Sequence, residues 1–197
     1  MSDIRVDTGN IRGNFTVTEF LALKTATGSI VTNISMLNDA TISQHPPTTA
    51  SITTNTGVID SRFSLFAVDA KDKVRVPSGG SFLVDTKSDT SAVHVKFDDA
   101  PVDSTLVLTS KTSAGSINVD LYPTYEGTFS LSSGVSSPVV SVKGEVEDPA
   151  GKGRKRMVKF ARARGHVTVG EVMWGNTRVD GSRVDLKSYV GTPRLSL

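Results

Sequence analysis

The chain has 197 residues, no cysteine and a formal net charge of +2 at pH 7. The absence of cysteine excludes disulfide bonds and thiolate metal sites. The near balance of charges argues against a surface that attracts nucleic acid as a whole. No apolar run approaches the length of a membrane span, and residues 1–6 contain no signal-peptide core, so no secretion signal is visible.

Alternation of apolar and polar residues dominates the chain. Segments with this period of two are predicted to be strands, and they cover residues 20–24, 81–85, 92–97, 105–109 and 166–170. Turns rich in Gly, Asn, Asp, Ser and Pro separate them. Residues 44–49 and 77–80 are expected to form inserted loops, and only residues 69–74 could hold a helical turn.

A short phrase, Gly-x-Ile, recurs after Thr- and Ser-rich turns. Its copies begin at Gly9, Gly28, Gly57 and Gly115, and Ser91 takes the glycine position in a degenerate copy. We expect each glycine to lie at a corner with positive φ, where a side chain is unfavourable. Recurring strand-turn units of this size are typical of stacked coils.

The apolar residues that follow each glycine keep fixed offsets. Stacking would align them in two interior columns: Ile11, Ile30, Ile59, Val93 and Ile117 in the first, and Phe15, Ile34 and Phe63 in the second. The sequence therefore predicts an all-β domain over residues 1–197, a β-solenoid of short-strand coils with about three strands per coil. Residues 1–121 would form the repeat coils, and residues 122–197 divergent coils with an irregular hairpin cap. A β-sandwich is the alternative.

Three segments resemble a known family. They are Leu-Tyr-Pro-Thr-Tyr-Glu-Gly-Thr-Phe-Ser-Leu at 121–131, Glu-Asp-Pro-Ala-Gly-Lys-Gly-Arg-Lys-Arg at 147–156 and Gly-His-Val-Thr-Val-Gly-Glu-Val-Met-Trp at 165–174. Together with the repeats they are similar to a fungal, basidiomycete family related to adhesin-like β-solenoid proteins. The resemblance implies a solenoid fold and display at the cell surface, and it carries no established activity.

Few residues suggest catalysis. His45, His94 and His166 share no spacing typical of a metal site, and no metal or cofactor is predicted. His94, between two valines, is expected to face away from the core. The carboxylates Asp98, Asp99 and Asp103 could serve a lyase or hydrolase, although the first two are typical of a turn. Glu145 and Glu147 are expected to balance the cations that follow.

The strongest local signal is a run of cations between residues 152 and 164. Its members are Lys152, Arg154, Lys155, Arg156, Lys159, Arg162 and Arg164. Met157 is expected on one face of a strand, with Arg156, Val158 and Phe160 on the other. The run is interpreted as a solvated hairpin or as a site for anions such as acidic glycans, phosphate groups or lipid headgroups.

Aromatic residues offer a second candidate. If Tyr122, Tyr125 and Trp174 are exposed, they could form an apolar platform for a sugar. Tyr125, Glu126 and Trp174 are therefore possible companions of the basic run. The alternative is that Trp174 closes the end of the core. The sequons at Asn14 and Asn33 are expected on the outer face.

These observations predict a binding or adhesion domain without enzymatic activity, with glycan or cell-wall polysaccharide as its partner and no role in nucleic-acid binding. A carbohydrate-binding lectin, a polysaccharide lyase or hydrolase, and a structural protein that associates with copies of itself through the solenoid ends are the alternatives.

Overall fold

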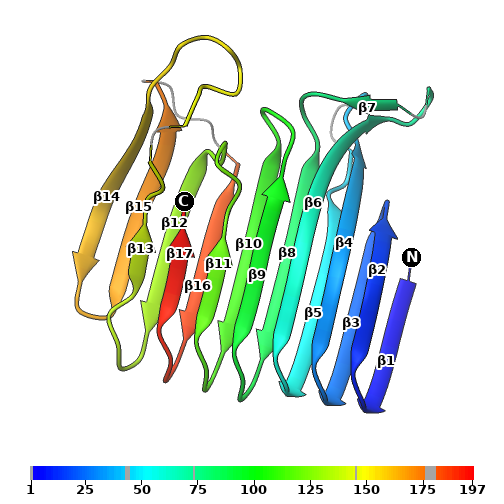
Figure 1. Ribbon diagram of the computed structural model, residues 1–197, viewed down its shortest axis with the longest axis vertical. Helices are drawn as coiled ribbons and strands as arrows, with labels where there is room; N and C mark the ends of the chain where they lie inside the picture. Colours follow the sequence, from blue (N-terminus) through cyan, green and yellow to red (C-terminus); the bar gives the residue numbers. More distant parts are fainter. Residues whose placement is uncertain (1, 43–44, 73, 145, 176–180) are drawn as a thin grey trace.

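The computed structural model describes residues 2–42, 45–72, 74–144, 146–175 and 181–197, apart from the side chains of residues 162–164. These parts of the chain form two stacked β-sheets without a helix (Figure 1). The prediction of an all-β protein is therefore confirmed. In place of a helical turn, Asp69 Oδ1 accepts hydrogen bonds from the backbone N–H of Lys71 and Asp72, at 2.9 and 3.2 Å.

The larger sheet, called sheet A, has nine strands. In spatial order they are β1 (Ser2–Thr8), β3 (Phe20–Thr27), β5 (Thr48–Thr56), β8 (Ser81–Ser88), β10 (Thr105–Thr112), β16 (Arg183–Ser188), β12 (Gly127–Ser133), β15 (Val167–Trp174) and β14 (Arg156–Arg164). All neighbours are parallel except β12–β15 and β15–β14.

The second sheet, called sheet B, has eight strands. Their order is β13 (Val139–Ser141), β17 (Pro193–Ser196), β11 (Ile117–Asp120), β9 (Val93–Asp99), β6 (Ile59–Asp69), β4 (Ile30–Asp39) and β2 (Ile11–Val17), with β7 (Val74–Val76) paired antiparallel to β6. Apart from β7, which pairs with β6, and the three successive sheet A strands β14, β15 and β16, the chain alternates between the sheets, and each pass consists of two strands. The expectation of three short strands per pass is wrong, because the segments on each side of the glycine extend into strands of up to 11 residues.

Both predicted interior columns are confirmed by the strand register. Ile30 pairs with Ile11 and Ile59, and Val93 pairs with Ile59 and Ile117. In the second column Phe63 pairs with Ile34 and Phe97, and the two phenylalanine rings stack with their centroids 5.2 Å apart. The core thus consists of equivalent side chains packed on one another across parallel strands. Burial of each large apolar side chain contributes about 1.5–3 kcal/mol.

The glycine corners bring successive passes of the chain unusually close. Gly28 and Gly57 have φ values of 145° and 152°. A Cβ atom on either one would lie 2.0 Å from the carbonyl oxygen of the preceding corner, Gly9 or Gly28. The sequence-based prediction of positive φ is confirmed, and the short approach adds a second reason for glycine.

A hydroxyl group three residues before each corner connects it to the neighbouring corner. Each hydroxyl donates a hydrogen bond to the carbonyl oxygen of the neighbouring corner, over distances of 2.8–3.3 Å. The pairs are Thr25 with Gly9, Thr54 with Gly28, Ser88 with Gly57, Thr112 with Ser91, Ser188 with Gly115 and Ser133 with Gly191. We call this series the hydroxyl ladder. It shows that Gly191 and Ser136 occupy corner positions that the sequence pattern did not reveal.

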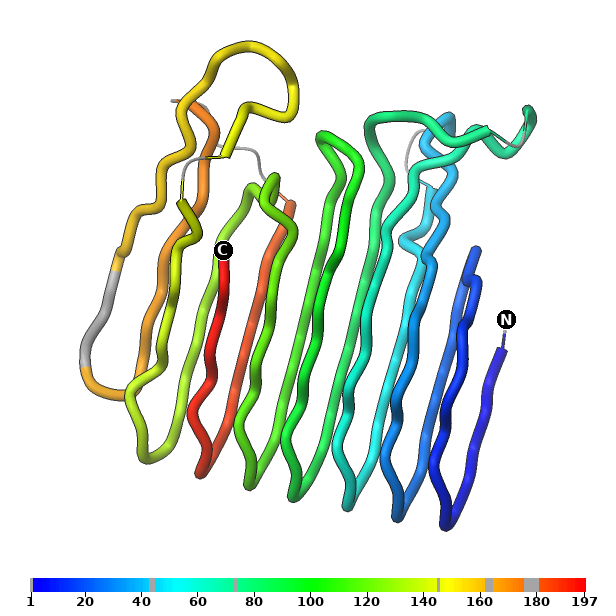
Figure 2. Tube along the Cα trace, viewed as in Figure 1, coloured from blue at the N-terminus to red at the C-terminus, as the bar shows by residue number. Residues whose placement is uncertain are grey.

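The last two strands do not lie at the end of the stack. β16 and β17 are inserted between the pair β10–β11 and the pair β12–β13, which precede them in the chain. Figure 2 shows the C-terminal segment enclosed by the body of the molecule, whereas the N-terminal strand lies at one end. Stacking therefore departs from chain order after β11.

At the end of the stack opposite β1, sheet A extends by more strands than sheet B. β12 is followed in sheet A by β15 and β14, while sheet B ends at β13. The antiparallel hairpin β14–β15 thus extends beyond the last strand of sheet B. Residues 142–144 and 146–155 lie at this same end of the molecule (Figure 1).

We expect the substitution Gly57→Ala to destabilise the fold by at least about 2 kcal/mol, because the new Cβ would clash with a backbone carbonyl and strain a positive φ. Urea unfolding checks the change. Gly144→Ala is the matched control, because a Cβ atom at that position would have no neighbour within 4 Å. Equal losses in both variants would contradict the packing argument.

The substitution Thr54→Val should cost about 1–2 kcal/mol, because it keeps the shape but removes the buried donor to the Gly28 carbonyl. Thr56→Val is the comparison, since Thr56 is exposed and its hydroxyl contact to Ala26 is 3.4 Å long. A loss of unfolding free energy for Thr56→Val as large as that for Thr54→Val would show that the ladder adds no stability.

Candidate functional site

The basic segment begins with a loop organised by one carboxylate. Asp148 accepts backbone hydrogen bonds from Ala150, Lys152 and Arg154, each 3.0 Å long. The Arg154 guanidinium adds a bidentate contact through Nε and Nη2, and the Asp148 side chain is only 3% exposed. These donors, with the Arg154 side chain first, hold the pKa of Asp148 well below its usual range.

Arg154 is therefore not a free cation. Asp148 holds its guanidinium and raises its pKa. The sequence pattern predicted Arg154 to be one of a series of equivalent charges. In the structure its charge is neutralised inside its own loop, and its main effect is to fix residues 148–154 in one conformation.

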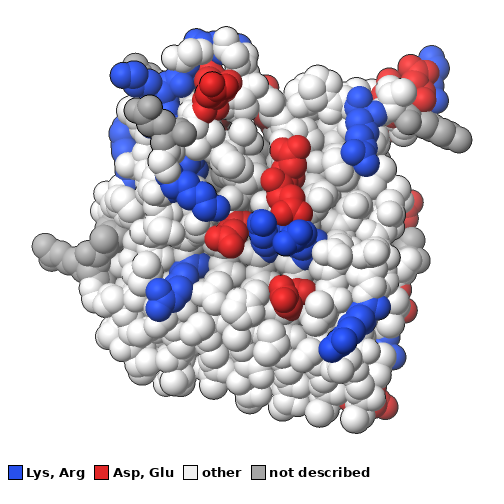
Figure 3. All heavy atoms as spheres, viewed as in Figure 1, with Lys and Arg blue, Asp and Glu red and all other residues white. Residues whose placement is uncertain are grey.

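A groove of about 480 Å³ lies beside this loop. Its lining comes from two segments that meet at the end of the stack: Val142, Lys143, Gly144 and Val146, and Arg154, Lys155, Arg156 and Val158. The described lining residues include four cations and no carboxylate. Figure 3 shows Lys and Arg side chains gathered at this end of the molecule.

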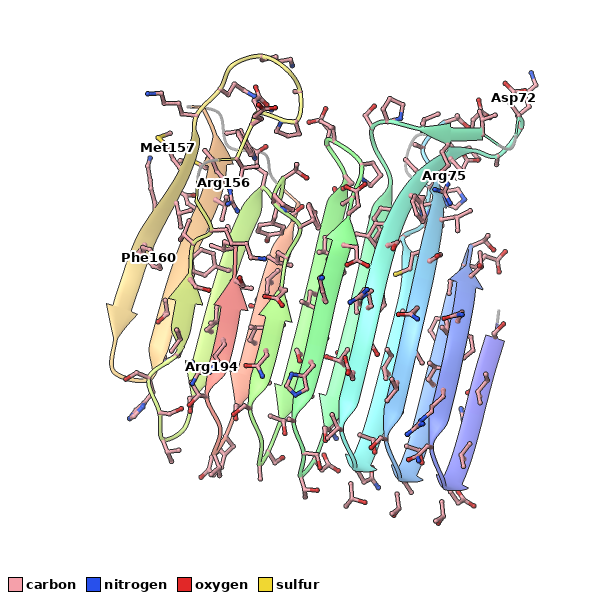
Figure 4. The ribbon with its side chains drawn as sticks, in the orientation of Figure 1. Asp72, Arg75, Arg156, Met157, Phe160 and Arg194 are labelled. Carbon is pink, nitrogen blue, oxygen red and sulfur yellow. The ribbon has the colours of Figure 1, made fainter. Side chains whose placement is uncertain are left out.

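Arg156 is the unusual member of the groove. It begins β14 and points toward the body of the molecule (Figure 4). Its Nε, Nη1 and Nη2 atoms are buried and have no hydrogen-bond partner among the described residues. Loss of contact with water lowers its pKa. A buried guanidinium without a counter-charge is costly, by several kcal/mol in typical proteins.

The alternation predicted around Arg156 is confirmed. Val158 packs against the core, and Phe160 makes an edge-to-face contact with the core residue Phe129, with ring centroids 5.8 Å apart. Phe160 is nevertheless 48% exposed, because sheet B ends before it reaches this hairpin.

A second, much smaller cavity of about 20 Å³ lies next to the groove. Its lining includes Ser104, Tyr122, Glu126, Arg154 and Trp174. Ser104 Oγ and Trp174 Nε1 are both buried, and neither has a hydrogen-bond partner in the described part of the protein. A space of this size holds about one water molecule.

The aromatic platform predicted for sugar binding is wrong. Tyr122, Tyr125 and Trp174 are 3%, 0% and 1% exposed. The Tyr125 hydroxyl donates to the Thr128 carbonyl, and Glu126 Oε1 accepts a hydrogen bond from the Trp174 backbone N–H, at 3.3 Å. Burial raises the pKa of both tyrosines. Tyr122 and Tyr125 belong to the core cluster, and Trp174 is buried beside them without joining that cluster.

Lys152 and Lys159, the other described cations of the run, do not line the groove. Lys152 and Lys159 are exposed, and Lys159 is opposite Glu171 in the strand register. Arg162 and Arg164 belong to β14, and their side chains lie outside the described residues. Lys143, which lines the groove, was missed because it precedes the run; its only signal was the exposed Val-Lys-Gly stretch between β13 and the loop.

The other candidate residues are dispersed. Asp98 pairs with Arg62 and Lys96, at 3.6 and 3.4 Å, while Asp99 accepts a hydrogen bond from the Ala100 N–H. Asp103, in contrast, lines the small cavity. Glu145 and Glu147 are predicted from the sequence to balance the cations that follow. In the described loop Asp148 is the carboxylate that pairs with Arg154, and Glu145 lies outside the described residues.

Two further expectations concern the exposed faces of the strands. His94 is partly exposed between the buried Val93 and Val95, and its Nδ1 lies 3.1 Å from Asn118 Nδ2. Asn14 and Asn33 are exposed neighbours joined by a 2.9 Å hydrogen bond. Both expectations of an outward orientation are confirmed.

The comparisons with known proteins give no match to this chain, whether with protein-family models, with curated proteins or with solved structures. Among the described residues, no group of three His, Asp or Glu side chains is arranged to hold a metal ion. None of the described residues form a helix that is long and apolar enough to cross a membrane.

Replacing Asp148 with Asn should loosen loop 148–154, because a neutral amide cannot balance the Arg154 guanidinium. We expect faster amide hydrogen exchange at Lys152 and Arg154, with little change in the strands. In the wild-type protein the carboxylate has a depressed pKa, so its contribution is complete above the ordinary Asp pKa of about 4 and is lost as pH falls through the folded-state value. Unchanged exchange at both amides in the variant would refute this role for Asp148.

Proposed function

We propose that this protein is a non-enzymatic binding domain that holds an anionic group in the groove beside Arg156. The resemblance to adhesin-like fungal proteins supports a role at the cell surface. In this proposal the two-sheet stack is a flat β-solenoid with two strands per coil, closed at one end by the β14–β15 hairpin. The parallel register and the repeated corners support that interpretation.

The observation that carries the proposal is the buried guanidinium of Arg156, which has no hydrogen-bond partner within the described ranges of the chain. Since such a charge destabilises a fold unless it is compensated, its retention is explained by a ligand that supplies the negative charge. Lys143 and Lys155 line the same groove and would add to the attraction. Arg is well suited to this task because its planar fork binds carboxylate, sulfate or phosphate through two hydrogen bonds.

The walls of the groove favour a ligand with an apolar part beside its charge. Val142, Val146 and Val158 line it together with the cations. The face of a sugar ring that carries an acidic group has this combination of properties. Polysaccharide cleavage is less well supported, because Asp98 is ion-paired, Asp99 caps its own turn and Asp103 lies in the separate cavity.

The substitution Arg156→Met tests the proposal in two ways. Without a bound anion, the variant should be more stable than the wild-type protein by about 1–3 kcal/mol, because an apolar side chain replaces an uncompensated charge. Sodium sulfate or sodium glucuronate, compared with sodium chloride at equal ionic strength, should raise the melting temperature of the wild-type protein by more than that of the variant, whose gain reports only the general salt effect.

Lys152→Gln serves as the matched control, because it removes an exposed cation that does not line the groove. It should respond to the anions as the wild-type protein does. The proposal fails if the Arg156→Met variant gains as much from the anions as the wild-type protein, or if sulfate, phosphate and glucuronate all leave the wild-type melting temperature unchanged.

A further inference from the structure

A row of cations crosses the outer face of sheet A, away from the groove. Lys87 on β8, Lys111 on β10 and Lys187 on β16 are register partners on three consecutive strands, and all three are exposed. Because neighbouring strands are about 4.8 Å apart, the three lysines follow one another at that spacing. We call them the lysine row.

The same register line continues on both sides of the lysine row. Its seven positions, from one end of the sheet toward the other, are Arg5, Lys24, Thr53, Lys87, Lys111, Lys187 and Ser132. Five of them are cations and none is a carboxylate. The sequence alone does not reveal this line, because its seven members lie on seven different strands and are dispersed over residues 5–187.

A hollow of about 400 Å³ accompanies the lysine row. Besides the three lysines it is lined by Ser88, Thr112, Ser113 and Tyr189. Tyr189 is 68% exposed, so it offers the flat aromatic surface that the buried aromatic residues at the other site cannot provide. Lys87 pairs with Asp89 at 3.2 Å, while Lys111 and Lys187 form no ion pair in the described structure.

We propose that the lysine row binds a linear acidic polysaccharide, with its charged groups on the lysines and one sugar ring against Tyr189. Such a chain carries negative groups at regular intervals along one direction, as the row carries positive ones. Lysine side chains are long and flexible, so they can follow charges whose repeat differs somewhat from the strand spacing.

The surroundings of the row distinguish this partner from two others. Asp85 and Asp185 lie two residues away along their strands, on the same outer face, and would repel a flat anionic membrane. Nucleic acid is disfavoured because a single exposed aromatic residue gives stacking for one base only. A narrow row of lysines flanked by carboxylates fits a single polysaccharide chain, which can contact the lysines without covering the carboxylates.

The test measures binding of polygalacturonate, which has one carboxylate per sugar, at low salt. The double substitution Lys111→Gln with Lys187→Gln should weaken binding about tenfold and reduce its dependence on salt. Tyr189→Ala should weaken binding with the salt dependence unchanged. Lys71→Gln, which removes an exposed cation from the turn after β6, should bind as the wild-type protein does.

Arg156→Met separates this surface from the groove: it should leave polygalacturonate affinity within about twofold of wild type. The inference is overturned if polygalacturonate does not bind, if the double lysine variant binds it as the Lys71→Gln control does, or if Arg156→Met alone abolishes binding. It is also overturned if single-stranded DNA binds as tightly and with the same dependence on the two lysines, which would assign the row to nucleic acid.

Discussion

The close contact between successive corners is the constraint on which the rest of the structure depends. A glycine without a side chain lets each corner approach the carbonyl group of the preceding one, and the hydroxyl ladder holds that carbonyl in place. Both interactions fix the position of one strand relative to the next. Since a shift of one residue would move every side chain to the opposite face, a fixed corner determines what is buried and what is exposed along the whole pass.

The consequences of this register are visible on both sides of the sheets. Inside, equivalent apolar residues form columns such as Ile11–Ile30–Ile59. Outside, the same alignment converts single lysines from distant segments into one row, Lys87–Lys111–Lys187. The scaffold therefore produces linear arrays of equivalent groups, and such arrays suit linear partners.

The groove has a different origin, in the place where the regular stacking ends. Sheet A continues for two strands beyond the last strand of sheet B, so the inner side of β14 has no opposing strand. On this side Val158 is partly buried, Phe160 is half exposed, and the guanidinium of Arg156 is enclosed without a hydrogen-bond partner in the described part of the chain. One molecule thus has two distinct candidate surfaces, one made by the repeat and one by its interruption.

The sequence by itself determined the all-β class, the strands with the clearest alternation, the corner glycines and the two interior columns, because these follow from local patterns with a period of two and from the repeated Gly-x-Ile phrase. Only the tertiary structure decided that β16 and β17 are inserted before β12, since strand order depends on which edges meet rather than on local pattern. It also decided that Arg154 is neutralised by Asp148, that Trp174 and Tyr125 are buried, and that the Arg156 guanidinium has no hydrogen-bond partner among the residues that the structure describes. The number of charges along a chain cannot show which side chains are paired and which are buried, because pairing and burial depend on residues that the fold brings from distant parts of the sequence.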